Sequence, residues 1–109
     1  MAINYRLKIS PQIETEDVPS LPKELQEDWL YFKGVLQSDP YKCDNLPWHS
    51  LRGKLKGFRA VEVEYRGDKN LYRLVFKICE KPSPRHVIIL SFTMLDLAYE
   101  KAKARRRKE

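Results

Sequence analysis

The chain has 109 residues, of which 42% are hydrophobic and 33% are charged, and its net charge is +6. This length fits one domain with a small core, and this composition excludes a disordered chain. The longest apolar run, VIIL at residues 87–90, is too short to span a bilayer, and the first residues lack the pattern of a signal peptide. We therefore expect a soluble, cytoplasmic domain without membrane contact.

Charge is unevenly distributed along the chain. Residues 1–40 contain four cations and seven anions, a net charge of −3, whereas residues 41–109 contain 17 cations and eight anions, a net charge of +9. A basic region of this kind is typical of proteins that bind an anionic partner, although ordinary solubility explains the same numbers. The two cysteines, Cys43 and Cys79, form no CxxC or Cys/His cluster, so we expect neither a metal site nor a cofactor.

The first elements in chain order are a strand and a helix. Residues 3–9 alternate as a short strand, and a polar connection with three prolines follows. A helix is predicted over residues 21–38, with Ser20 as its cap. Its apolar stripe, at helical spacing, consists of Leu25, Trp29, Phe32 and Leu36. Such a stripe is typical of a helix that packs on a core.

The rest of the chain predicts strands and a closing helix. After an irregular segment over residues 41–53, strands at residues 58–65 and 71–78 form a hairpin. A third strand covers residues 87–92, and residues 94–109 form a helix. Hairpin-linked strands predict an α+β fold in a single domain over the whole chain, with a small twisted antiparallel sheet that includes the N-terminal strand. A helical layer is expected on one face, together with the C-terminal helix.

Strand alternation divides the hairpin between two faces. We expect Tyr72, Leu74 and Phe76 to lie beneath the helix of residues 21–38. The other face is expected to be uncovered, and it carries Glu62, Glu64, Ala60, Arg73 and Lys77. Pairs between carboxylates and cations across the strands would explain this face without any function.

The segment WHSLRGKLKGFR, residues 48–59, combines a histidine with four cations. An imidazole can act as an acid or a base at cellular pH, and cations can hold a phosphate. We interpret the segment as the rim of an anion-binding surface in which a turn brings Lys54, Lys56 and Arg59 beside His49.

Several short motifs resemble the RelE/ParE superfamily of bacterial toxins. They are the turn Leu51-Arg52-Gly53, the strand led by Phe58, the run Tyr72-Arg73-Leu74-Val75-Phe76 and the closing segment LDLAYEKAKAR. The resemblance extends from about residue 46 to the C-terminus. It implies a toxin with a helical layer on a twisted antiparallel sheet, and it implies an acidic antitoxin as partner.

The resemblance implies one function and leaves two alternatives. Many members are ribosome-dependent endoribonucleases that cleave messenger RNA without a metal, so the ribosome and messenger RNA are expected partners. A related branch binds DNA gyrase without cleaving RNA, so the alternative is a non-catalytic protein on the same scaffold, either a gyrase inhibitor or an inactive relative. The third interpretation is an interaction module with no role in nucleic-acid binding.

The resemblance assigns catalysis to three residues, and each has a plainer explanation. His49 stands at the spacing of a catalytic histidine in the HigB branch, but a loop histidine packed near Trp48 would look the same. Arg73 matches an arginine that holds the scissile phosphate, but a cross-strand pair with Glu62 or Glu64 would also explain it. Tyr99 matches a tyrosine in the closing helix of RelE and could stack on a base or hydrogen-bond near the phosphate, but it also falls on the apolar stripe of its helix.

The remaining nucleic-acid contacts are expected from cations around the histidine and on the second hairpin strand. They are Arg52, Lys54, Lys56, Arg59 and Lys77. The chain departs from the RelE pattern at two places. Ala60, Glu62 and Glu64 occupy the strand that carries lysines in RelE, and Thr93 falls near the position of an arginine. The resemblance of the fold is therefore closer than that of the catalytic set.

Overall fold

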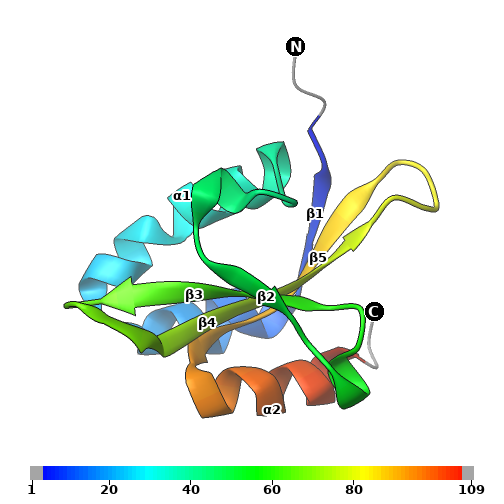
Figure 1. The fold of residues 1–109 in the computed structure, drawn as a ribbon. Coiled ribbons are helices and arrows are strands. Elements are labelled where there is room, and N and C mark those ends of the chain that lie inside the picture. Colours follow the sequence, from blue (N-terminus) through cyan, green and yellow to red (C-terminus); the bar gives the residue numbers. More distant parts are fainter. Residues whose placement is uncertain (1–3, 107–109) are drawn as a thin grey trace.

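The computed structural model describes residues 4–106 and contains a five-stranded sheet between two helices (Figure 1). The strands lie side by side in the order β1-β5-β4-β3-β2. Their bounds are β1 Arg6–Ile9, β2 Trp48–Ser50, β3 Arg59–Tyr65, β4 Asp68–Cys79 and β5 His86–Met94. The predicted α+β architecture is confirmed. The sheet is mixed, however, because β1 runs parallel to β5 while the other pairs are antiparallel.

α1 (Lys23–Ser38) covers one face of the sheet, as its apolar stripe predicts. Leu74 and Phe76 of β4 are fully buried in the core beneath it, and Tyr72 packs partly buried against the same core. The core residues that α1 contributes are Leu25, Trp29, Phe32, Val35 and Leu36. The expected faces of the hairpin strands are therefore confirmed.

The connection before α1 differs from the polar loop that we expected. It forms two short helical segments, η1 (Ile13–Asp17) and η2 (Val18–Ser20), and Ile13 and Asp17 are fully buried. Ser20 does not cap α1, because its hydroxyl donates a hydrogen bond to the carbonyl of Glu16. The N-cap residue of α1 is instead Pro22, and its side chain makes no capping hydrogen bond.

α2 (Leu95–Arg105) covers the second face of the sheet, which we expected to be uncovered. Ala98 and Ala102 of α2 are fully buried against Ala60 and Val75 of the hairpin. Small side chains let the helix approach the strands closely, and the sheet thus lies between two helices (Figure 1). Residues 107–109, which the sequence assigns to the same helix, lie outside the described residues.

β5 is an interior strand between β1 and β4, and it is buried on both sides. Every residue from His86 to Thr93 is buried, since α1 packs on one face of the strand and α2 on the other. A nearly continuous apolar run is typical of a strand with both faces covered. Its register with β4 shifts by one residue between Val75 and Phe76, which is a β-bulge.

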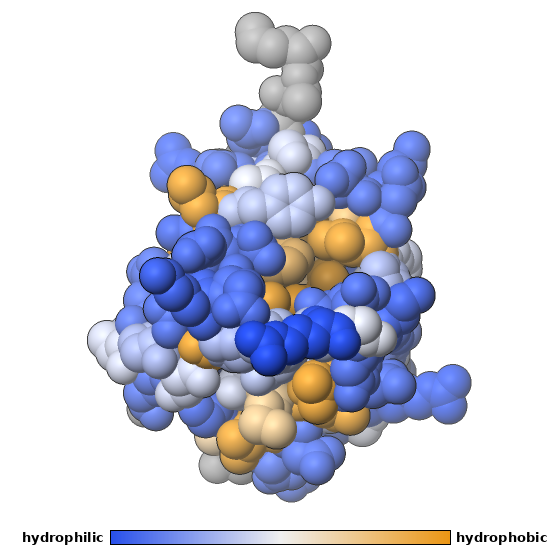
Figure 2. Space-filling view, turned by 90° about the vertical axis from the view of Figure 1, so that its left-hand side faces the viewer, coloured by the Kyte–Doolittle hydropathy of each residue, from blue (hydrophilic) through white to orange (hydrophobic). Residues whose placement is uncertain are grey.

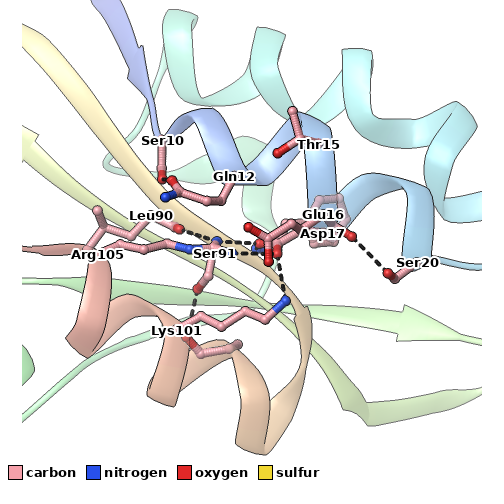
Figure 3. Close-up of polar contacts among 12 residues, drawn as sticks. Ser10, Gln12, Thr15, Glu16, Asp17, Ser20, Leu90, Ser91, Lys101 and Arg105 are labelled. Atoms are coloured by element: carbon pink, nitrogen blue, oxygen red, sulfur yellow. Dashed lines mark hydrogen bonds and ion pairs between the residues drawn. The ribbon is translucent and has the colours of Figure 1, made fainter. Parts of the chain in front are cut away.

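A buried ion pair attaches α2 to η1 (Figure 3). The guanidinium of Arg105 donates to both carboxylate oxygens of Asp17, at 2.7 and 2.9 Å, and Lys101 donates to the same carboxylate at 3.1 Å. The backbone N–H of Phe92 donates to Asp17 as well, at 2.9 Å. The sequence ends in a run of cations, Arg105-Arg106-Arg107-Lys108, of the kind expected at a frayed helix end. Arg105 is only 7% exposed, so this residue is anchored instead, while Arg107 and Lys108 lie outside the described residues.

Candidate functional site

His49 lies on β2, a short edge strand that occupies part of the segment expected to be irregular. β2 pairs antiparallel with β3, and this register places His49 opposite Ala60. Its side chain therefore lies on the face that α2 covers. There its Nε2 is 3.3 Å from the hydroxyl of Tyr99 on α2, and its Nδ1 is 3.4 Å from Oε2 of Glu62 on β3. Three separate elements thus converge on one imidazole.

The two contacts of His49 define complementary roles for its ring nitrogens. A carboxylate at Nδ1 favours the tautomer with the proton on that nitrogen, which leaves Nε2 free to accept a proton. The Tyr99 hydroxyl is placed to donate to Nε2 across the 3.3 Å separation. The side chain of His49 is 42% exposed, so a ligand can reach it from solvent. This arrangement can transfer protons between a ligand, an imidazole and a phenol.

Arg73 does not emerge on an open face, because α2 covers that face and leaves the residue only 5% exposed. Its Nη1 donates to the backbone carbonyls of Lys69 and Tyr72, at 3.1 and 2.9 Å. It stands opposite Glu62 in the sheet register, yet among residues 4–106 it forms no ion pair. Its buried Nε has no hydrogen-bond partner in the same range. The cross-strand pair that would explain Arg73 without a function is therefore not formed.

The basic turn, residues 51–57, follows β2 directly and is held in shape by backbone hydrogen bonds. The N–H of Leu51 donates to the carbonyl of Phe58 at 2.9 Å, and a 3-10 segment, η4 (Gly53–Leu55), lies within the turn. Gly53 and Gly57 have φ values of +63° and +94°, which favour glycine. Leu55 is buried beside α2, so the turn is anchored against the helix. Its cations, Arg52, Lys54 and Lys56, all point into solvent.

Arg59 does not lie beside His49 as we expected. It pairs with Ser50 across the β2–β3 ladder, and alternation directs it to the face opposite His49. Its guanidinium carbon is 4.2 Å from the centre of the Trp48 ring and 5.2 Å from that of Tyr41. Lys77, by contrast, lies on the α2 face, with its ammonium 5.4 Å from the centre of the Phe58 ring. The predicted cations are thus divided between the two faces of the sheet.

A carboxylate with two phenol partners lies near Arg59. Glu80 accepts hydrogen bonds from Tyr5 at 2.5 Å and from Tyr41 at 2.7 Å. The bond to Glu80 raises the pKa of Tyr5 to about 12 and also raises the pKa of Tyr41. The same two bonds lower the pKa of Glu80 below its ordinary value. These contacts fix the position of Tyr41 and leave the cluster without a free nucleophile.

The described part of the chain contains neither a cluster of metal ligands nor a membrane-spanning helix. Between residues 4 and 106, no three His, Cys, Asp or Glu side chains come together in a way that could hold a metal ion. No helix in that range is long and apolar enough to cross a membrane.

Solved structures of toxin–antitoxin proteins share this fold. One chain of the RelBE2 toxin–antitoxin complex from Mycobacterium tuberculosis superimposes with a TM-score of 0.63 and 20% identity, over 84% of this chain and 99% of that chain. The YoeB/ParE toxin from Agrobacterium tumefaciens superimposes with a TM-score of 0.50 and 9% identity, over 82% of this chain and 97% of the toxin. No protein-family model and no curated protein matches the sequence.

These likenesses confirm the expected resemblance at the level of the fold. Identities of 20% and 9% establish the fold alone, so functional residues must be judged from this structure. Neither neighbour is described as a HigB protein, and the HigB-like assignment of His49 stays a prediction.

Sequence reasoning brought His49 and Tyr99 into one site but missed the role of Glu62. Glu62 was interpreted as a partner of Arg73, whereas its carboxylate contacts His49. The signal that could have identified this contact is the short β2–β3 hairpin. Trp48-His49-Ser50 would have to be recognised as a strand paired with the one that begins near Phe58.

Proposed function

We propose that this chain is the toxin of a toxin–antitoxin pair and that it cleaves messenger RNA on the ribosome without a metal. The observation that carries the proposal is the contact between His49 and Tyr99, with Glu62 behind the imidazole. RNA cleavage by its own 2′-hydroxyl needs a base, an acid and positive charge near the phosphate. His49 and Tyr99 supply the first two, and the basic turn supplies the third.

The proposed reaction is an in-line attack of the ribose 2′-oxygen on the adjacent phosphorus. His49 Nε2 takes the proton of the 2′-hydroxyl, while the bond from phosphorus to the 5′-oxygen breaks. Tyr99 donates its proton to the departing 5′-oxygen, and the imidazolium then returns a proton to the phenolate across the contact between them. The products are a 2′,3′-cyclic phosphate and a 5′-hydroxyl. Glu62 stabilises the imidazolium, since its carboxylate lies 3.4 Å from Nδ1.

Positive charge for the phosphate is assigned first to the exposed cations of the basic turn. Arg73 is part of the proposed site as the cation opposite Glu62 in the sheet register, where its charge partly offsets that of the carboxylate without an ion pair. It could bind the scissile phosphate itself only after its guanidinium leaves the carbonyls of Lys69 and Tyr72. Its unpartnered Nε supports a role beyond packing, because a buried donor without a partner is costly.

An acidic antitoxin is the proposed protein partner, and two features support it. The net charge of +6 favours an acidic partner. Figure 2, which looks at the tip of the β3–β4 hairpin, shows apolar side chains gathered in a hollow between hydrophilic ones. A cavity of about 500 Å³ between α1 and β3 is lined by the apolar residues Tyr31, Phe32, Leu46 and Val63. Asp28, Glu62, Glu64 and Lys69 also line it, so this cavity supports a protein partner but not the acidity of that partner. Exposed apolar surface of this kind suits a protein partner.

The second candidate is a non-catalytic binding protein on the same scaffold, either a gyrase inhibitor or an inactive relative. The burial of Arg73 favours it, because an arginine bonded to backbone carbonyls does not grip a phosphate. Glu62 and Glu64, both on β3, also favour a non-catalytic protein, because their carboxylates repel the phosphates of RNA.

The test is to express the protein alone in bacteria, to follow growth and to map the 5′ ends of cellular RNA. The unmutated protein should arrest growth and produce new 5′ ends within translated messages. His49→Ala should abolish both effects, because losing an acid–base group slows cleavage by about a hundredfold to ten-thousandfold. Tyr99→Phe should also slow cleavage, because it removes the proton of the proposed acid. Tyr31→Phe is its matched control, since it removes an exposed hydroxyl of α1 that donates to Asp44.

The outcomes separate the two candidates. The protein could arrest growth without producing new 5′ ends, and His49→Ala could leave that arrest unchanged. This result would contradict the nuclease and support the non-catalytic candidate. A protein that neither arrests growth nor changes the RNA would contradict both toxic roles and leave an inactive relative.

A further inference from the structure

The face of β2 opposite His49 carries an ordered stack of aromatic rings and a cation. The Arg59 guanidinium lies between the Trp48 and Tyr41 rings, 4.2 Å and 5.2 Å from their centres. Trp48 is 37% exposed and Tyr41 is 42% exposed, while Arg59 is half-buried between them. Arg59 forms no ion pair within residues 4–106. One cation thus lies over two rings that still present surface to solvent.

Contacts on both sides hold this stack in place before any ligand arrives. Tyr41 is fixed through its hydroxyl, which donates to Glu80 at 2.7 Å. Trp48 and Arg59 are fixed by the β2–β3 ladder, in which Trp48 pairs with Val61. A pre-ordered aromatic surface loses little conformational freedom when a ligand binds, so its contacts contribute more fully to affinity.

The basic turn continues directly from this stack. A cavity of about 420 Å³ lies where they meet, and it is lined by residues 50–53 and 56–59. No acidic residue occurs between Asn45 and Val61, whereas the exposed cations Arg52, Lys54 and Lys56 occur within that stretch. The surface therefore combines a flat ring, a cavity and uncompensated positive charge.

We propose that Trp48, Arg59 and the basic turn form a second RNA subsite, in which one unpaired base stacks on the open face of Trp48. Phosphates beside that base contact Arg52 and Lys56, which line the cavity. The inference rests on the proposed function, because it places single-stranded RNA across the edge strand β2. Trp48 lies on one face of that strand and His49 on the other.

Single-stranded RNA fits this surface better than other anionic partners. Base stacking needs an accessible ring, and bases within a duplex are already stacked on each other and cannot reach it. An acidic protein would satisfy the cations, but it has no preference for a flat ring with a guanidinium behind it. An aromatic platform next to a basic groove is the combination by which single-stranded nucleic acids are held.

The two tryptophans provide a direct measurement. Trp29 is 6% exposed and donates a hydrogen bond to Glu14, so quenching by a bound base reports Trp48. The probes are an unstructured RNA decamer, the same sequence as a duplex, and polyglutamate. We expect the single strand to quench the fluorescence, and the duplex and polyglutamate to leave it unchanged. Trp48→Ala should bind the single strand about tenfold to a hundredfold more weakly, while Trp48→Phe should keep most of the affinity.

The salt dependence separates stacking from charge. Trp48→Ala should leave the slope of log affinity against log salt unchanged, since no phosphate contact is lost. The double variant with Arg52→Ala and Lys56→Ala should lower the magnitude of that slope by about 1.4, because each phosphate contact on a single strand contributes about 0.7. Leu30→Ala removes an exposed apolar side chain from α1, away from this surface, and serves as the control that changes neither quantity.

The same variants are assayed for cleavage of messenger RNA on bacterial ribosomes, where the message is already held. There we expect Trp48→Ala to raise KM with little change in kcat, and Trp48→Phe to restore KM. Cleavage and RNA binding by Trp48→Ala equal to those of the unmutated protein would overturn the subsite and leave the nuclease intact. Quenching by polyglutamate but not by RNA would assign the surface to an acidic protein. Loss of cleavage in His49→Ala is the separate criterion for the nuclease itself.

Discussion

Replacing Asp17 by alanine should be among the most destabilising single changes in this protein. The carboxylate accepts hydrogen bonds from Arg105, Lys101 and the backbone N–H of Phe92, and it is fully buried. Its removal leaves a guanidinium that is 7% exposed and whose remaining hydrogen-bond partner, among residues 4–106, is the carbonyl of Leu90. Breaking one side of such a buried ion pair costs about 3–5 kcal/mol. A domain of this size has a free energy of unfolding of about 5–15 kcal/mol, so the loss is a large fraction of the total.

Urea denaturation and thermal unfolding followed by circular dichroism measure this loss. The expected decrease in Tm is roughly 12–30 °C, since a chain of this length loses about 4–6 °C per kcal/mol. The matched variant combines Asp17→Leu with Arg105→Met, which removes both charges and should recover most of the stability. A loss below about 1 kcal/mol for Asp17→Ala would refute the reasoning. So would a double variant no more stable than Asp17→Leu alone.

Three further predictions concern the site and its surroundings. Tyr99→Phe should slow RNA cleavage at least tenfold without lowering Tm, measured by 5′-end mapping and calorimetry, because it removes the proton of the proposed acid. The triple variant in which Ala replaces Arg52, Lys54 and Lys56 removes the exposed cations of the basic turn. In filter-binding titrations it should reduce the slope of log RNA affinity against log salt by about 2. In ultraviolet titration Tyr5 should ionise near pH 12 rather than 10, and Glu80→Gln should lower that midpoint. Because the folded pKa of Tyr5 is the higher one, its contribution to stability is complete below pH 10 and is lost as the pH rises toward 12.

The periodicity of apolar residues was enough to predict the side of the sheet that α1 covers. Leu25, Trp29 and Phe32 at helical spacing, and Leu74 with Phe76 at strand spacing, each follow from local geometry. These patterns show that one face of an element is buried, but they do not identify the element that packs against that face. The parallel pairing of β1 with β5 is a long-range contact with no local signal, so the mixed sheet could not be predicted from the pattern.

The candidate site was predictable only in part, for a related reason. His49 and Tyr99 were identified by a resemblance of short motifs, and the structure brings them within 3.3 Å. The burial of Arg73 was missed because α2 has a weak apolar stripe, whose buried members are mainly the small residues Ala98 and Ala102. Alanines leave little trace in a hydrophobic pattern, although they allow the close packing that covers Arg73.

The order of the strands in the sheet determines when the sheet and the candidate site can form during synthesis of the chain. β5, which pairs with both β1 and β4, follows the other four strands in the sequence, and the ion pair that secures α2 joins residues 88 positions apart. The first strand cannot pair until β5 has been synthesised, and contacts of such separation form late in folding. Tyr99 therefore meets His49 only after β5 and α2 have both been synthesised. On a ribosome that has not yet reached residue 99, the growing chain carries His49 without its proposed proton-transfer partner.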